Sequence, residues 1–411
     1  MRRSPSWVRI GGAIIAAGLA VFFATSAAAG HFPFSSPRTP GSAAASRSPA
    51  PPRAGAAPSG PVSSPPAGAA GSPGLSLQQM AGQRVIFSYH GLTPPARLLQ
   101  LIEHGEAGGV IFFGHNISSL AQITKVITEI ERANASPLNP VRAPLLLMTD
   151  QEGGIIRRMP GAPFLSERQI GEAASPAAAA AAAGTSGGLN LRGAGMTVNL
   201  APVLDVYRQP GDFDDQFGRS YSTNPAVVGK LGADFITAQQ RTGVAATAKH
   251  FPGLGAATKR QNTDKMPVTL NVSLTTIRNT DEVPYQAAIT AGVRLVMVSW
   301  AVYPALAPGR PAGLSRAIAD GELRQRLGFK GVTVTDALEA GALKKFGPTQ
   351  NRALLAAQAG MDLLLCSAQN VDEGQQASAA LVQGYQDGQL GHPGFAGALQ
   401  RVLALRASVG G

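Results

Sequence analysis

Two apolar segments of this 411-residue chain end in side chains that can perform acid–base or nucleophilic chemistry. The first ends in Lys249 and His250, within the sequence Lys-His-Phe-Pro-Gly-Leu-Gly, and the second ends in Asp336. In α/β barrels, polar groups at the carboxyl ends of parallel strands form the active site. The two segments therefore predict a site on the rim of such a barrel.

Eight apolar segments predict strands, and eight is the number that closes a parallel barrel. Their apolar character is continuous, as expected for strands that helices cover on one side and that pack together on the other. The segments are 84–89, 109–113, 144–149, 196–203, 244–249, 294–299, 331–335 and 361–366. The predicted crossover helices are 119–134, 224–241, 274–291 and 351–360, with an alanine-rich helix at 173–183. We therefore predict an α/β fold, a single (β/α)8 barrel of the TIM type over residues 74–411.

The first 73 residues predict a leader and a linker. Residues 1–30 have three arginines, an apolar stretch and then small residues, which is the layout of a secretory signal peptide. The apolar stretch 10–29 is nearly long enough to remain as a membrane anchor. Residues 31–73 are mostly Ala, Pro, Ser and Gly, which predicts a disordered linker. We expect an extracellular or cell-envelope protein, secreted or anchored to the outer face of the plasma membrane.

The composition excludes several classes of function. The net charge of +11 includes six arginines of the first 73 residues, and the rest of the chain has no basic stripe with interleaved aromatics, so we expect no nucleic-acid binding. No cluster of Cys and His has zinc-site spacing, so we expect no metal and no cofactor. The only cysteine, Cys366, lies in an apolar segment and is predicted to be buried in the core. We expect a monomer.

Five ordered motifs resemble a known family. They are Asp150-Gln-Glu-Gly-Gly with Arg158, Asn199-Leu-Ala-Pro-Val-Leu-Asp-Val, Gly218-Arg-Ser-Tyr, Lys249-His-Phe-Pro-Gly and Thr335-Asp336. In this order and at the spacing of barrel strands, they resemble the signatures of glycoside hydrolase family 3. The resemblance is specifically to its single-domain β-N-acetylhexosaminidases, and it covers about residues 75–405.

The resemblance implies a retaining glycoside hydrolase with a carbohydrate substrate. By position, Asp336 would be the nucleophile that forms a glycosyl-enzyme intermediate. Residues that bind the sugar would be Asp150, Arg158, Arg219, Lys249 and His250. The implied reaction removes β-linked N-acetylglucosamine from cell-wall-derived glycans such as peptidoglycan fragments.

One part of the pattern is missing. In the family's hexosaminidases, Pro-Gly-His-Gly is followed by Asp-Ser-His, and the His-Asp dyad is the general acid/base. This chain has Leu254 at the first His position and Gln261-Asn262-Thr263 in place of Asp-Ser-His. Threonine cannot protonate a leaving group near neutral pH.

Three hypotheses address the missing dyad. In the first, Asp264 is the acid/base, which requires that partial burial raises its pKa. Another group on the rim, such as His115, is the second option. In the third, the site retains binding but has lost efficient cleavage, or it acts only on substrates with good leaving groups. At the level of function, the alternatives are a degenerate, weakly active or inactive family member that binds wall glycans, and a family 3 enzyme with another sugar preference, such as a β-glucosidase.

Overall fold

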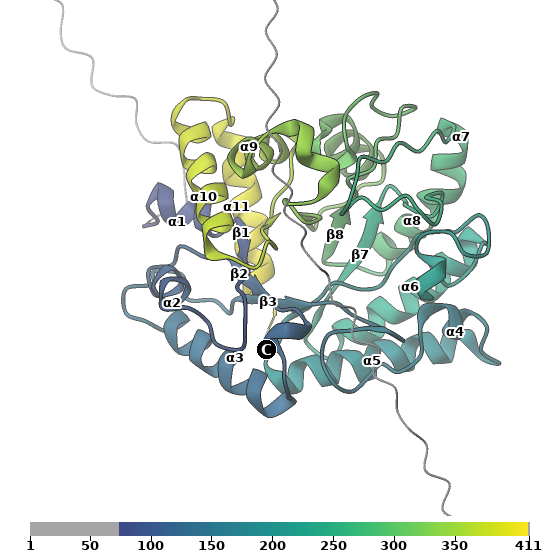
Figure 1. Cartoon of the computed structure of the whole chain (residues 1–411), viewed down its shortest axis with the longest axis horizontal. Helices are drawn as coiled ribbons and strands as arrows, with labels where there is room; N and C mark the ends of the chain where they lie inside the picture. Colours follow the sequence, from purple (N-terminus) through teal and green to yellow (C-terminus); the bar gives the residue numbers. More distant parts are fainter. Residues whose placement is uncertain (1–73, 410–411) are drawn as a thin grey trace, which may run out of the picture. The chain divides into compact units, whose positions relative to one another are not determined.

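The fold is a barrel of eight parallel strands surrounded by helices, in a computed structural model that describes residues 74–409 (Figure 1). The strands follow the order β10-β1-β2-β3-β6-β7-β8-β9. A parallel bridge between Val334 of β9 and Leu363, directly before β10, joins the two ends of this order. The predicted α/β barrel is therefore confirmed. The predicted signal or anchor at 1–30 and the linker at 31–73 lie outside the described residues.

All eight predicted strands are present. Their bounds are β1 (Val85–Phe87), β2 (Gly109–Ile111), β3 (Leu146–Thr149), β6 (Val198–Asn199), β7 (Ala245–Phe251), β8 (Leu295–Val298), β9 (Val332–Thr335) and β10 (Leu364–Leu365). Strand β7 continues two residues beyond the predicted end at Lys249, so both Lys249 and His250 belong to the strand itself. The sequence did not predict the antiparallel hairpin of β4 (Gln151–Gly153) and β5 (Ile156–Arg157). Positive φ angles at Gly153 and Gly154 allow its tight turn.

The helices cover the outside of the barrel. The α-helices are α1 (Leu77–Gly82), α2 (Ala96–Glu103), α3 (Leu120–Asn134), α4 (Glu167–Gly171), α5 (Pro176–Ala194), α6 (Pro225–Gln240), α7 (Leu274–Thr276), α8 (Val283–Thr290), α9 (Thr349–Ala359), α10 (Val371–Gln386) and α11 (His392–Ala407). Shorter or irregular turns are η1 (Gly114–Asn116), η2 (Asp215–Phe217), η3 (Ile277–Asp281), η4 (Ala312–Leu314), η5 (Ala317–Arg326) and η6 (Gly341–Phe346).

Two predicted helices have different bounds. The alanine-rich helix was predicted at 173–183, but α5 begins at Pro176, a residue suited to the first helical turn, and continues to Ala194. Gly195 ends it in the left-handed conformation, with φ 92°. The helix predicted at 274–291 is divided into α7, the π-helical turn η3 and α8, and Pro284 lies at the start of α8.

Apolar side chains pack on both sides of the strands. Inside the barrel, strand residues form one buried cluster, for example Ile86, Met148, Val198, Leu295 and Val334. The opposite faces of the strands pack against the helices in a second, larger cluster. Both faces of each strand are thus buried, which explains the continuous apolar segments.

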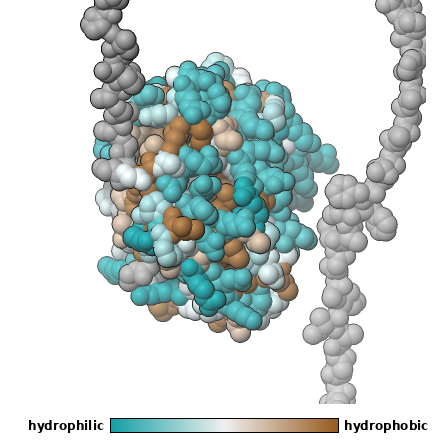
Figure 2. All heavy atoms as spheres, turned by 90° about the vertical axis from the view of Figure 1, so that its left-hand side faces the viewer, coloured by the Kyte–Doolittle hydropathy of each residue, from teal (hydrophilic) through white to brown (hydrophobic). Residues whose placement is uncertain are grey.

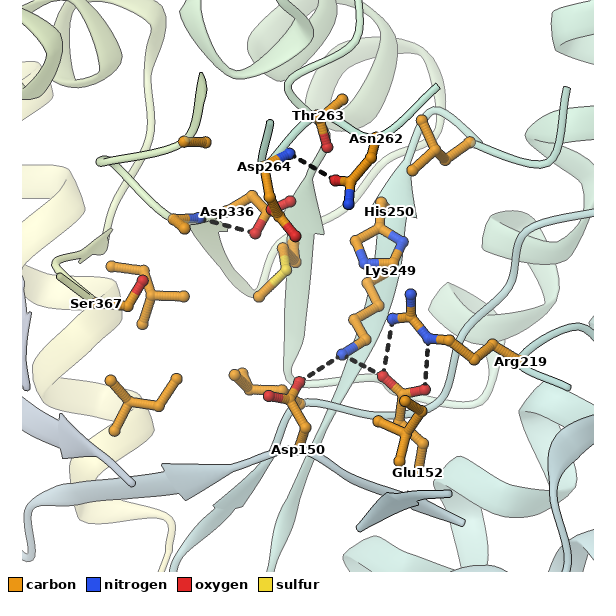
Figure 3. A pocket seen from close by; sticks show the side chains of 18 of the residues that line it. Asp150, Glu152, Arg219, Lys249, His250, Asn262, Thr263, Asp264, Asp336 and Ser367 are labelled. Atoms are coloured by element: carbon orange, nitrogen blue, oxygen red, sulfur yellow. Dashed lines mark hydrogen bonds and ion pairs between the residues drawn. The ribbon is translucent and has the colours of Figure 1, made fainter. Parts of the chain in front are cut away.

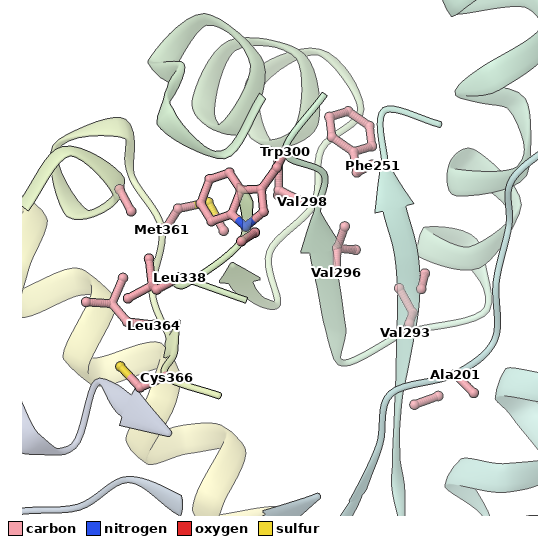
Figure 4. Packing of buried hydrophobic residues seen from close by; sticks show 14 of the residues in the cluster. Ala201, Phe251, Val293, Val296, Val298, Trp300, Leu338, Met361, Leu364 and Cys366 are labelled. Carbon is pink, nitrogen blue, oxygen red and sulfur yellow. The ribbon is translucent and has the colours of Figure 1, made fainter. Parts of the chain in front are cut away.

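Cys366 is fully buried in the outer cluster, near Leu364, so its predicted place in the core is confirmed (Figure 4). In contrast, the face that carries α1 and α10 is largely hydrophilic with scattered apolar side chains, as expected for helices that turn their apolar side inward (Figure 2). Among residues 74–409, no helix combines the length and the apolar character that crossing a membrane requires.

Candidate active site

A polar pocket of about 500 Å³ opens at the carboxyl ends of the strands. All seven residues that the sequence predicted for the site line it: Asp150, Arg158, Arg219, Lys249, His250, Asp264 and Asp336. They come from β7 itself, from the segments after β3, β7 and β9, and from the loop after η2. The barrel thus brings together residues that are up to 186 positions apart in the chain.

Lys249 is the centre of an ionic network at the base of the pocket (Figure 3). Its Nζ lies 2.8 Å from Asp150 Oδ1 and 2.7 Å from Glu152 Oε1. Arg219 donates two parallel hydrogen bonds to Glu152, from Nε at 2.8 Å and from Nη2 at 2.9 Å. Such bidentate pairs restrict the orientation of both side chains. The network therefore restricts the side chain of Asp150 to few rotamers.

Burial and charge act in opposite directions on these groups. Burial alone would raise the pKa of Asp150, but the positive charges of Lys249 and Arg158 hold that pKa below its usual value. Burial alone would lower the pKa of Lys249, but Asp150 and Glu152 raise it. Asp150 is therefore an anion and Lys249 a cation near neutral pH. A rigid charged pair of this kind suits hydrogen bonding to sugar hydroxyls.

His250 is oriented by a buried carboxylate. Its Nδ1 lies 2.7 Å from Asp205 Oδ2, while its own backbone N–H and that of Leu254 donate to Asp205 Oδ1. Burial alone would lower the pKa of His250, but Asp205 raises it above the usual value. Next to this pair, burial raises the pKa of Asp214 to about 7, and the negative charge of Asp205 adds to the rise, while Arg219 opposes it.

Within the described residues, one group of side chains has a geometry that could hold a metal ion: Asp205, Asp214 and His250. One ligand atom from each lies within 4.8 Å of the others. However, Asp205 already accepts three N–H groups, and Arg219 Nη1 lies 2.6 Å from Asp214 Oδ1. A guanidinium this close repels a cation. The arrangement fits a hydrogen-bonded network that orients His250 better than a metal centre.

The side chains of Asp336 and Asp264 extend into the same part of the pocket (Figure 3). The backbone N–H of Ala337 donates to Asp336 Oδ1 at 2.8 Å, which fixes the carboxylate. Asp264 is exposed at the pocket mouth, but protein atoms displace part of its hydration shell. This desolvation and the negative charge of Asp336 raise the pKa of Asp264 to about 6. An acid with this pKa is suited to proton transfer near neutral pH.

The loop of Asp264 is attached to the loop that follows Asp336. The backbone N–H of Gly341 donates to Asp264 O at 2.7 Å, and that of Ala342 donates to Thr263 O at 3.0 Å. A Cβ atom at Gly341 would lie only 2.2 Å from Lys265 O, so a side chain there would displace the loop. Close backbone contact therefore sets the distance between the two carboxyl groups.

Neither position of the missing dyad carries a hidden proton donor. Leu254 is buried, with 2% of its surface exposed, and Thr263 is buried with 3% exposed. His115, the alternative donor, is not among the residues that line the pocket. Its ring stacks on Phe113 and His90, with centroids 5.8 Å and 5.1 Å away. The geometry thus favours Asp264 over His115.

Several pocket residues were not among the predicted site residues. Glu152 could have been found, because it lies two residues after Asp150 in the same motif. Glu339 also lines the pocket, and no ion pair among residues 74–409 involves it. Its Oε1 accepts a hydrogen bond from Ser367 at 2.8 Å. Burial, together with the negative charge of Asp336, raises the pKa of Glu339. Phe213 and Phe217 form an apolar part of the wall. No local sequence pattern indicates that these two aromatics line the site, because only the folding of the long loop after β6 places them in the pocket wall.

Sequence comparisons identify the family and similar proteins. Residues 77–405 match the family described as "Glycosyl hydrolase family 3 N terminal domain". A relative from Arthroderma benhamiae, named "Uncharacterized secreted glycosyl hydrolase", is 46% identical over 334 residues, covering 81% of this chain and 94% of the relative. A "Beta-hexosaminidase" of Thioalkalivibrio sulfidiphilus is 33% identical over 275 residues, covering 65% of this chain and 75% of the relative.

Solved structures show the same fold. A family 3 β-N-acetylglucosaminidase from Paenibacillus sp. FPU-7 superposes with a TM-score of 0.76 at 33% identity. That match covers 81% of this chain and 62% of the solved chain. A β-N-acetylhexosaminidase from Beutenbergia cavernae gives a TM-score of 0.72 at 31% identity and covers 81% of this chain and 98% of the solved one.

Proposed function

Because the chain belongs to glycosyl hydrolase family 3 and is a glycoside hydrolase, we propose that it removes β-linked N-acetylglucosamine from cell-wall-derived glycans with retention of configuration. The observation that carries the proposal is that Asp336 and Asp264 extend into the same part of the pocket, above the ionic network of Lys249. Retaining glycosidases use two carboxyl groups in this way, one as nucleophile and one as acid/base.

In the first step, a carboxylate oxygen of Asp336 attacks the anomeric carbon as the bond to the leaving oxygen breaks. Asp264 transfers its proton to that oxygen, so the aglycone departs as a neutral alcohol. In the second step, Asp264 takes a proton from water, and the water oxygen attacks the anomeric carbon and releases Asp336 as a carboxylate. The two steps return both carboxyl groups to their starting states.

The remaining predicted residues would bind the terminal sugar. Asp150 and Lys249 offer an acceptor and a donor fixed 2.8 Å apart, and Arg158 lies beside Asp150 at 3.8 Å. Hydrogen bonds from charged groups strengthen as positive charge develops on the sugar ring. In this proposal His250, oriented by Asp205, and Arg219, fixed by Glu152, complete the sugar site.

The proposed location is outside the cytoplasm. Support comes from the signal-like residues 1–30 and from the relative of 46% identity whose name calls it secreted. Retention through the apolar segment 10–29 is the alternative, and cleavage of that segment decides between secretion and anchoring.

A comparison of two aryl glycosides tests the proposed sugar preference. We expect kcat/KM for 4-nitrophenyl β-N-acetylglucosaminide to exceed that for the β-glucoside at least tenfold, since only the former has an acetamido group to bind, and tenfold corresponds to about 1.4 kcal/mol. Both rates are measured as nitrophenol release by the full chain.

Other results would favour the competing functions. Similar rates on both glycosides would indicate a family 3 enzyme with another sugar preference. Binding of muropeptides without turnover of either glycoside would instead indicate a wall-glycan binding module, the function that the buried Leu254 and Thr263 favour.

Gly341→Ala tests whether the contact between the two loops places the acid. The added Cβ would meet Lys265 O at 2.2 Å, and the loop of Asp264 must move away. We expect kcat/KM on an alkyl β-N-acetylglucosaminide to fall about tenfold to a hundredfold, because a displacement near 1 Å can cost this much. A dinitrophenyl glycoside, whose leaving group hardly needs a proton, should be hydrolysed nearly as well as by the wild type.

Gly193→Ala is the matched control, because a Cβ there meets nothing within 4 Å. It should leave both substrates unaffected. Equal losses on both substrates in Gly341→Ala would contradict a specific effect on the acid.

A further inference from the structure

A second cavity lies at the opposite end of the barrel. It has a volume of about 510 Å³ and is lined by Arg84, Arg316, Arg324 and Arg401, with Asp320 and Phe395. Arg84 comes directly before β1, and Met361, which also lines the cavity, precedes β10. Because the strands are parallel, this amino-terminal end is far from the pocket of Asp336.

The carboxylates near this cavity do not balance its arginines. Asp362 is buried and is already bonded to Arg324 Nη2 at 2.5 Å, to Arg401 Nη2 at 2.8 Å and to the backbone N–H of Thr333 at 2.9 Å. Asp320 lies 3.6 Å from Arg316, whose side chain is mostly exposed. Four guanidinium groups thus face two carboxylates, which leaves an excess of two positive charges.

Within the described residues, Arg84 is the arginine of this cavity that has no carboxylate partner. Arg324 and Arg401 share the single carboxylate of Asp362. Its side chain is 2% exposed, and it donates to two backbone carbonyls, Met361 O at 2.8 Å and Asp362 O at 3.1 Å. Its guanidinium also lies over the Phe395 ring, 4.8 Å from the centroid. Within residues 74–409, no carboxylate oxygen lies within salt-bridge distance of it. A buried charge without a counter-ion is costly, so the site has free capacity for an anion.

The start of α11 adds to this capacity. Gly391 and Gly394 line the cavity, and no side chain caps the amino terminus of this 16-residue helix. The first backbone N–H groups of a helix have no partner within the helix, and its dipole is positive at this end. Arginines and a free helix terminus together are the groups that bind phosphates and carboxylates.

We propose that this arginine cavity binds a small anion with a phosphate or dicarboxylate group. The site is separate from the glycosidase pocket and does not depend on the proposed substrate. Arg84 supplies a charge that no carboxylate among the described residues pairs with, the largely exposed Arg316 adds a second guanidinium, and α11 supplies backbone donors.

Titration calorimetry with the full chain tests the proposal, with inorganic phosphate and succinate as probes at ionic strength matched by sodium chloride. We expect saturable binding that weakens at least tenfold in Arg84→Met and in Arg316→Gln. The control is Arg310→Gln, because Arg310 is exposed and takes part in no ion pair among the described residues. This variant should bind the probes like the wild type. The pocket variant Asp336→Asn should bind equally well, because its substitution is at the other end of the barrel.

The results separate the two ligand chemistries. Binding of phosphate alone identifies a phosphate site, and binding of succinate identifies a carboxylate site. If Arg84→Met does not fold, as judged by its thermal unfolding, Arg316→Gln carries the test, since its side chain is 79% exposed and its loss does not disturb packing. Dissociation constants weaker than about 10 mM for both probes, or equal weakening by Arg310→Gln, would overturn the proposal.

Discussion

Asp336→Asn is expected to lower kcat/KM on an aryl β-N-acetylglucosaminide about a thousandfold or more, the scale on which loss of a nucleophile acts. Asparagine has the same shape, and its oxygen can still accept the N–H of Ala337 that now bonds Asp336 at 2.8 Å. The sugar site of Lys249 and Asp150 stays intact, so binding of N-acetylglucosamine should change little. The measurement is nitrophenol release, with sugar affinity determined separately by calorimetry.

Glu339→Gln is the matched control for this prediction. Glu339 lies on the same loop three residues later and also lines the pocket. Its substitution therefore shows the effect of removing a neighbouring carboxylate that is not the nucleophile. A slowly hydrolysed 5-fluoro glycosyl fluoride should label the wild type on the peptide that contains Asp336. A label on Glu339, or a full rate in Asp336→Asn, would show that the nucleophile is another residue.

Asp264→Ala is expected to separate substrates by their leaving groups. Hydrolysis of an alkyl glycoside should fall about a hundredfold to a thousandfold in kcat/KM, because general acid catalysis contributes on this scale. A dinitrophenyl glycoside leaves as a stable anion, so its kcat/KM should stay within about tenfold of the wild type. Azide, which attacks the glycosyl-enzyme without a base, should restore turnover of the dinitrophenyl substrate and yield the β-glycosyl azide.

The pH profile gives an independent readout of the same carboxyl group. Asp264 must be protonated to act as the acid, and its pKa is raised to about 6 by desolvation and by Asp336. As pH rises through this value, the protonated fraction falls, so kcat/KM on the alkyl glycoside should decrease above about pH 6, about tenfold for each further pH unit. The dinitrophenyl glycoside should lack this decrease.

Two results would assign the acid elsewhere. If Asp264→Ala slows both substrates equally, the change acts on the structure of the loop and not on proton transfer. If Glu339→Gln gives the leaving-group pattern instead, Glu339 is the acid, which its raised pKa and its place in the pocket would permit.

The barrel could be predicted from the sequence because its strands leave a strong local signal. Segments such as 294–299 and 331–335 are continuously apolar, and only strands buried on both faces require this pattern. The predicted ends of helices and strands were less accurate, since single residues and strand pairing determine where an element stops. Pro176 and Gly195 set the ends of α5, and β7 continues to Phe251 because pairing with β8 stabilises two further residues.

The sequence by itself determined which residues reach the rim: Asp150, Lys249, His250 and Asp336 follow or end predicted strands, and parallel strands in a barrel place their carboxyl ends on one face. Only the tertiary structure decided how these groups pair. The contact of Lys249 with Glu152, the bond of His250 to Asp205, and the meeting of Asp264 and Asp336 in one part of the pocket join segments 45 to 97 residues apart. Such contacts, and the pKa of about 6 that they give Asp264, depend on distances in space that no local pattern records.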